Sequence, residues 1–151
     1  MSVGKVNGNN QEYTQLYATI QKQAEAKKVS IKVFDANNDG KISLSELKLA
    51  QKQIPTMFVG NEEVQLEEYD KKGNLIKTSR RYANGEFINA STYTYSKQGK
   101  LEKITFLEKD GVVGTATYQY HQNGNLKSET SKFKDGSTSV FNYDKNGNMI
   151  P

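Results

Sequence analysis

Glycines recur at nearly even intervals through the second half of the chain, and this periodicity limits what that half can form. The glycines expected at turns are 12, 14, 12, 13, 12 and 11 residues apart, at Gly73, Gly85, Gly99, Gly111, Gly124, Gly136 and Gly147. Between them, from about Glu62 onward, apolar and polar residues alternate with a period of two. Such alternation between regular turn residues is typical of antiparallel strands, and glycines this frequent exclude helices there.

The turns are of two alternating kinds, so the repeating unit contains two strands and about 25 residues. The longer kind follows a tyrosine, at Tyr69, Tyr95, Tyr120 and Tyr143. The tighter kind contains Asn-Gly or Asp-Gly, at residues 84–85, 110–111 and 135–136. These dipeptides favour the primed turns of β-hairpins because both central residues take positive φ. The pattern predicts an antiparallel β-meander of about eight short strands over residues 59–151.

The longer turns also resemble known bacterial repeats. Residues 69–75, Tyr-Asp-Lys-Lys-Gly-Asn-Leu, and residues 143–149, Tyr-Asp-Lys-Asn-Gly-Asn-Met, resemble the YD repeats of bacterial Rhs-type proteins. They are also similar to the MORN-related repeats of small bacterial immunity-type proteins. The resemblance covers roughly residues 69–150 and implies a β-repeat architecture. Rhs proteins wrap many such repeats into a shell, and three or four copies cannot close one, so that role is not expected here.

Oxygen-bearing side chains alternate along residues 35–46 in the first half of the chain. A twelve-residue loop surrounds Ca²⁺ with about 6–8 oxygen ligands, supplied at positions 1, 3, 5, 7, 9 and 12. Those positions are held by Asp35, Asn37, Asp39, Lys41, Ser43 and Glu46. Lys41 would offer its backbone carbonyl, and Ser43 would act through water. Gly40 falls at position 6, where the chain must turn with positive φ.

This loop resembles an EF-hand, and its match to the pattern D-x-[DN]-x-[DN]-G-x₅-E is complete. The resemblance implies bound Ca²⁺ and a helix on each side of the loop. A first helix is expected from near Asn10, because its apolar residues recur at helical spacing, at Tyr13, Leu16, Tyr17, Ile20 and Ala24. Lys27–Ser30 should either kink or break it. Ser43 and Glu46 form a capping box for a second helix, which Pro55 ends.

The predicted fold class is therefore α+β, with an N-terminal helical unit followed by the meander. Residues 1–10 are expected to form a flexible arm, and residues 11–58 the helical unit with its single EF-hand. The stretch 55–60 is expected to be a linker. A single-layer sheet needs one face covered, so we expect the helices to pack on the first strands.

The composition argues against an enzyme. The chain has 151 residues, no cysteine and a single histidine, His121, which lies in a turn. Thiolate chemistry and Cys-based zinc sites are excluded, and neighbouring carboxylates such as Glu62 and Glu63 point to opposite faces of a strand.

Charge and hydropathy also limit the partners. Net charge is +4, with 8 basic and 5 acidic residues up to Phe58 and 13 and 12 after it. This balance does not predict nucleic-acid binding. No apolar run approaches the length of a membrane span, about 20 residues. No signal peptide is visible either, so we expect a cytoplasmic protein or one exported without a cleaved Sec signal.

Tyrosines and phenylalanines recur at the strand ends, where they should form aromatic ladders. These ladders either serve only to pack neighbouring strands together or also bind a ligand.

Three functions are compatible with the patterns of the whole sequence. The first is a calcium-binding, non-enzymatic bacterial module whose sheet binds another protein or a glycan. The second is a small immunity- or chaperone-like protein that binds a secreted toxin or effector. The third is a secreted glycan-binding module with a Tyr-rich sheet face. The unpaired EF-hand or the sheet edge could also support a homodimer.

Overall fold

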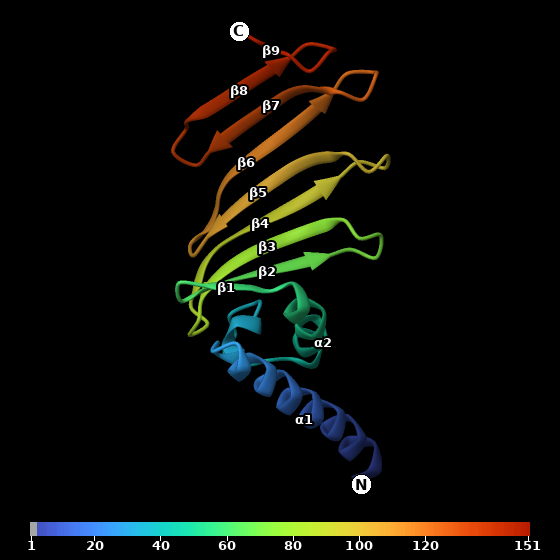
Figure 1. Ribbon diagram of the computed structural model, residues 1–151, viewed down its shortest axis with the longest axis vertical. Helices are drawn as coiled ribbons and strands as arrows, with labels where there is room; N and C mark the ends of the chain where they lie inside the picture. The colour runs from blue at the N-terminus through green and yellow to red at the C-terminus, as the bar shows by residue number, and fades with distance from the viewer. Residues whose placement is uncertain (1–2) are drawn as a thin grey trace. The chain divides into compact units, whose positions relative to one another are not determined.

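The computed structural model describes the backbone of residues 3–151 and the side chains of residues 10–151. Four helical elements precede the strands: α1 (Val3–Ala26), the 3-10 helix η1 (Ile31–Phe34), α2 (Leu44–Gln53) and the 3-10 helix η2 (Ile54–Thr56). All the strands follow them in the chain (Figure 1). This order confirms the α+β class, with an N-terminal helical unit and a C-terminal meander.

The sheet has nine strands, and neighbours in the sheet are neighbours in the sequence. They are β1 (Phe58–Gly60), β2 (Glu63–Tyr69), β3 (Leu75–Tyr82), β4 (Phe87–Tyr95), β5 (Leu101–Glu108), β6 (Gly111–Tyr120), β7 (Leu126–Phe133), β8 (Thr138–Tyr143) and β9 (Met149–Ile150). About eight had been expected. The additional strand is β1, which lies in the expected linker and pairs with β2. Val59 of β1 packs against the buried core, which explains why this stretch becomes a strand.

Helix α1 begins at Val3, well before the expected start near Asn10. Residues 3–10 of the expected flexible arm are therefore helical, while residues 1–2 lie outside the described part of the chain. A formed helix extends with one hydrogen bond per residue, so it can continue through weak helix formers. Of the kink or break expected at residues 27–30, the structure has a break: α1 ends at Ala26, and Lys28 has a φ of +61°.

Contacts divide the chain into two compact units, which differ from the expected division after residue 58. Unit 1 contains residues 1–68 and 79–88, and unit 2 contains residues 69–78 and 89–151. In unit 1 the largest fully buried side chains are Ile20, Val33, Leu47 and Val64. Val64 belongs to β2 and the other three to the helical segment, so the helices share their core with the first strands, as expected.

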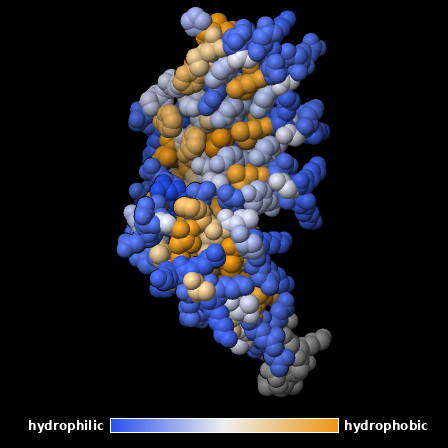
Figure 2. All heavy atoms as spheres, in the orientation of Figure 1, coloured by the Kyte–Doolittle hydropathy of each residue, from blue (hydrophilic) through white to orange (hydrophobic). Residues whose placement is uncertain are grey.

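Unit 2 is a single layer of strands with few buried side chains. Its tyrosines tie the strands together at the long-turn end. Tyr95 Oη donates to the carbonyl of Leu75 at 2.7 Å, and Tyr120 Oη donates to the carbonyl of Leu101 at 2.6 Å. Figure 2 shows apolar patches on the strands and hydrophilic residues along the turns. These tyrosines therefore link neighbouring strands through hydrogen bonds to backbone carbonyls, whereas the stacked ring pair of this sheet is Phe106 and Phe133.

Candidate metal centre

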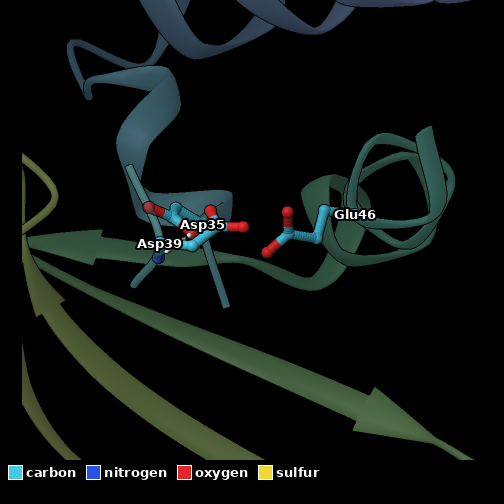
Figure 3. A group of neighbouring side chains, drawn as sticks. All are labelled: Asp35, Asp39 and Glu46. Carbon is cyan, nitrogen blue, oxygen red and sulfur yellow. Dashed lines mark hydrogen bonds between the residues drawn. The ribbon is translucent and has the colours of Figure 1, made fainter. Parts of the chain in front are cut away.

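Three carboxylates converge at the loop between η1 and α2. One oxygen from each of Asp35, Asp39 and Glu46 lies within 4.8 Å of the other two. In Figure 3 the two aspartates come from the loop, Glu46 comes from the first turn of α2, and their side chains point toward one another. Asp35 and Glu46 are each only 8% exposed, whereas Asp39 is exposed. This acidic triad could hold a metal ion.

The loop takes this shape because short side chains accept hydrogen bonds from the backbone that follows them. Asp35 accepts from the N–H of Gly40 at 2.9 Å and from that of Asp39 at 3.3 Å. Asn37 accepts from the N–H of Asp39 at 3.2 Å. Asp39 accepts from the N–H of Lys41 at 2.9 Å. Gly40 has a φ of +82°, as its place at position 6 predicts.

Glu46 joins the two ends of the loop. One carboxylate oxygen accepts from the N–H of Ser43 at 2.8 Å, and the other accepts from the N–H of Ala36 at 2.6 Å. In return the Glu46 N–H donates to the Ser43 hydroxyl at 3.1 Å, which completes the predicted capping box. The carboxylate is therefore positioned by the start of α2 and by the start of the loop together.

The structure brings together three of the six predicted ligands as a converging group: Asp35, Asp39 and Glu46. The other three lie in the same loop. The Asn37 amide oxygen and the Ser43 hydroxyl accept backbone N–H groups. Lys41 donates its own N–H to Asp39. Side-chain oxygens already bonded to backbone N–H groups keep further lone pairs, so these contacts leave them able to face a cation.

The donor set fits a hard divalent cation. The triad carries three negative charges at short range, and like charges this close repel one another. Its partners on the loop are neutral N–H groups, which orient the carboxylates without neutralising them. Carboxylate oxygens without imidazole or thiolate are the ligands that Ca²⁺, Mg²⁺ and Mn²⁺ prefer. Within the described residues this is the one group of three such side chains that converges.

Sequence reasoning missed Arg81 of β3, which is 3% exposed. Its guanidinium donates to the side-chain oxygen of Asn38 and to the carbonyl of Gly85, both at 3.0 Å. It also lies 5.4 Å from the centre of the Phe87 ring. Burial lowers the pKa of Arg81, while the negative charges of Asp35 and Glu46 raise it. An arginine keeps its proton under such conditions, so a buried cation lies beside the loop.

Tyr13 has a role that its place in an apolar helical stripe did not reveal. Its hydroxyl donates to the carbonyl of Ile42 at 2.6 Å. Ile42 stands at position 8 of the loop, and its carbonyl is therefore satisfied from α1 within the same chain. The neighbouring sequence predicts neither this contact nor that of Arg81 with Asn38, because the partners are 29 and 43 residues apart in the chain.

His121 contributes to turn packing in unit 2. Its Nε2 lies 2.8 Å from the carbonyl oxygen of Tyr143, and this contact joins two successive long turns.

The described helices include none that is both long enough and apolar enough to cross a membrane. A scan against models of protein families finds no match, and a search of curated proteins finds no similar sequence.

Proposed function

We propose that the loop of residues 35–46 binds Ca²⁺ and that the protein is a non-enzymatic interaction module stabilised by this ion. One observation carries the proposal: three carboxylates, two of them nearly buried, converge within 4.8 Å in a loop of matching sequence. A bound cation would supply the positive charge that the neutral N–H partners lack. It would also link the loop to the first turn of α2.

The complete ligand set would combine the triad with three weaker ligands. Asp35, Asp39 and Glu46 would provide carboxylate oxygens, and Asn37 would provide its amide oxygen. Lys41 would provide its carbonyl, and Ser43 would act through water. Six oxygen positions, which include a carbonyl and a water-mediated contact, favour Ca²⁺ over Mg²⁺, which demands a tight octahedron and retains most of its waters.

The test is a calorimetric titration of the protein with Ca²⁺, repeated with Mg²⁺. We expect one ion per chain and a weaker affinity for Mg²⁺. Asp39→Asn should weaken Ca²⁺ binding at least tenfold, because it removes one of three charges from the site. Asp39 is exposed and does not cap α2, so this variant should remain folded.

The matched control is Asp70→Asn. Asp70 also accepts backbone N–H groups within a turn, from Lys72 and Asn74, but it stands outside the triad. Calcium binding should be unchanged in this variant. A wild-type chain that takes up no Ca²⁺, or an Asp39→Asn variant that binds as tightly as the wild type, would contradict the proposal.

A second role concerns the sheet of unit 2, where a groove of about 640 Å³ is lined by apolar residues together with charged ones such as Glu108 and Lys134. Phe106 and Phe133 lie there with ring centres 6.3 Å apart, and Phe133 is 41% exposed. We propose that this face binds a glycan or a protein, including a secreted toxin or effector if the module has an immunity- or chaperone-like role. Half-exposed aromatic rings on a rigid sheet offer large contact areas.

Binding to glycan and peptide arrays tests this role, with Phe133→Ser as the variant and Phe141→Ser as a matched aromatic control outside the groove. Binding that persists in Phe133→Ser would contradict the assignment of the groove. Sedimentation of the wild type at several concentrations would test the proposed homodimer separately.

A further inference from the structure

The turn between β3 and β4 lies against the chain that leads into the metal loop. The N–H of Ser30 donates to the carbonyl of Ala83 at 2.7 Å. Gly85 has a φ of +99°, and a Cβ there would overlap the side chain of Lys32 and come within 3.0 Å of its carbonyl carbon. Within unit 1, the hairpin therefore contacts the helical segment just before the first loop ligand, Asp35.

Arg81 adds a contact inside the loop. Its two hydrogen bonds of 3.0 Å join Asn38, at loop position 4, to Gly85 in the β3–β4 turn. Asn38 has a φ of +58°, a conformation that asparagine tolerates but that still disfavours side chains. The guanidinium is rigid and buried, so it holds the Asn38 side chain in one orientation.

We infer that Arg81 is a positioning residue for the metal loop and that it couples metal binding to the order of the β3–β4 turn. The inference rests on the proposed binding of Ca²⁺. Arg81 fixes Asn38 between the ligands Asn37 and Asp39, so a loop held in this way needs less ordering when the ion enters. Coupling is reciprocal, so the bound ion also stabilises the turn that Arg81 grips.

The charge of Arg81 has the opposite effect on the ion, since a buried cation repels another cation nearby. Arg81→Lys separates the two effects. Lysine keeps the positive charge but is shorter and lacks the guanidinium, whose Nη1 donates to both acceptors. Asn38→Gly removes the acceptor from the other side, and glycine keeps the positive φ without strain. Asn38 is exposed, so this variant should fold even where a change at Arg81 does not.

The experiment measures Ca²⁺ affinity by calorimetry for the wild type, Arg81→Lys, Asn38→Gly and the double variant. Each single variant should bind about tenfold more weakly, and the double variant no more weakly than either, because both variants break the hydrogen bond between Arg81 and Asn38. Arg80→Lys is the matched control. Arg80 is the neighbouring residue on β3, pairs with Glu63 at the surface, and should have no effect on affinity.

Hydrogen exchange gives a second readout that a purely structural role of Arg81 would not move. The amides of Ala83 and Gly85 donate to the carbonyls of Glu62 and Tyr82. Their exchange should slow about tenfold on addition of Ca²⁺ in the wild type and in Arg80→Lys, and by much less in Arg81→Lys and Asn38→Gly.

The outcomes separate the inference from the proposed function. A wild-type chain that binds no Ca²⁺ overturns both. A wild-type chain that binds Ca²⁺, with single variants of equal affinity or a double variant weakened by the product of the two single effects, overturns the inference alone. The inference alone is also overturned if Ca²⁺ leaves the hydrogen exchange of the Ala83 and Gly85 amides unchanged in the wild type.

Discussion

Glu46 has two roles that one substitution can separate. Its carboxylate accepts from Ser43 at 2.8 Å and from Ala36 at 2.6 Å, and it belongs to the acidic triad. Glu46→Gln keeps one acceptor oxygen but turns an N–H₂ toward a backbone donor. Loss of one hydrogen bond to a charged group costs about 1.5–3 kcal/mol. Without calcium, Glu46→Gln should therefore lower the free energy of unfolding by this amount.

With calcium the loss should be larger. An ion at one hundred times its dissociation constant stabilises the folded chain by about 2.7 kcal/mol. If Glu46→Gln weakens binding about a hundredfold, the variant gains only about 0.4 kcal/mol at the same concentration. The gap between wild type and variant should therefore widen by about 2 kcal/mol.

Urea unfolding with excess Ca²⁺ and with chelator measures both gaps. Ser30→Ala serves as the control, because Ser30 caps η1 outside the metal loop. It should lower stability equally in the two conditions. The reasoning would be refuted if Glu46→Gln also lost the same amount with and without calcium, since Glu46 would then act only as a helix cap.

Two further predictions concern the turns. Gly85→Ala should lower the free energy of unfolding by about 2 kcal/mol or more, because it adds the overlap with Lys32 to the strain of positive φ. Gly136→Ala, at a φ of +90° in open space, should lose only about 1 kcal/mol in the same urea measurement, and equal losses would contradict the close contact. The hydrogen bond from the backbone N–H of Asn148 holds the pKa of Asp144 below its usual 3.8. The stabilisation of the folded chain by ionised Asp144 is therefore complete above that value and is lost as the pH falls through the lower folded pKa. Asp144→Asn should flatten the acid side of the profile of unfolding free energy against pH, measured with urea. An unchanged profile would show that the pKa of Asp144 is not lowered by folding.

The parts of the fold that the sequence predicts are those set by neighbouring residues. The loop around Asp35 is one, because its aspartates and asparagine bond backbone N–H groups two to five positions onward. The capping box of Ser43 and Glu46 spans three residues and was equally visible. The meander is another such part, since its turns join consecutive strands, and from β2 onward a glycine with positive φ lies in or beside each turn. Local chemistry was sufficient in all three places.

What the sequence could not reveal depends on contacts between distant residues. Nothing near Arg81 shows that its side chain is buried beside Asn38, and nothing near Tyr13 shows that it bonds Ile42. Strand β1 exists because β2 and the core are available to pair and pack with it. The division into units has the same origin, since residues 79–88 belong with the helices only through the packing of the hairpin.

These distant contacts also bear on whether Ca²⁺ reshapes the loop or only secures it. Three elements of unit 1 hold the loop: Tyr13 of α1 bonds Ile42, Glu46 of α2 bonds Ala36, and Arg81 of β3 bonds Asn38. All three bonds are formed within the chain, so we expect them to hold the loop without the ion as well. We therefore expect Ca²⁺ to raise stability while the far-UV circular dichroism changes little. A large gain of helical signal on adding Ca²⁺ would show instead that the ion folds the unit, as it would in a switch rather than a structural site.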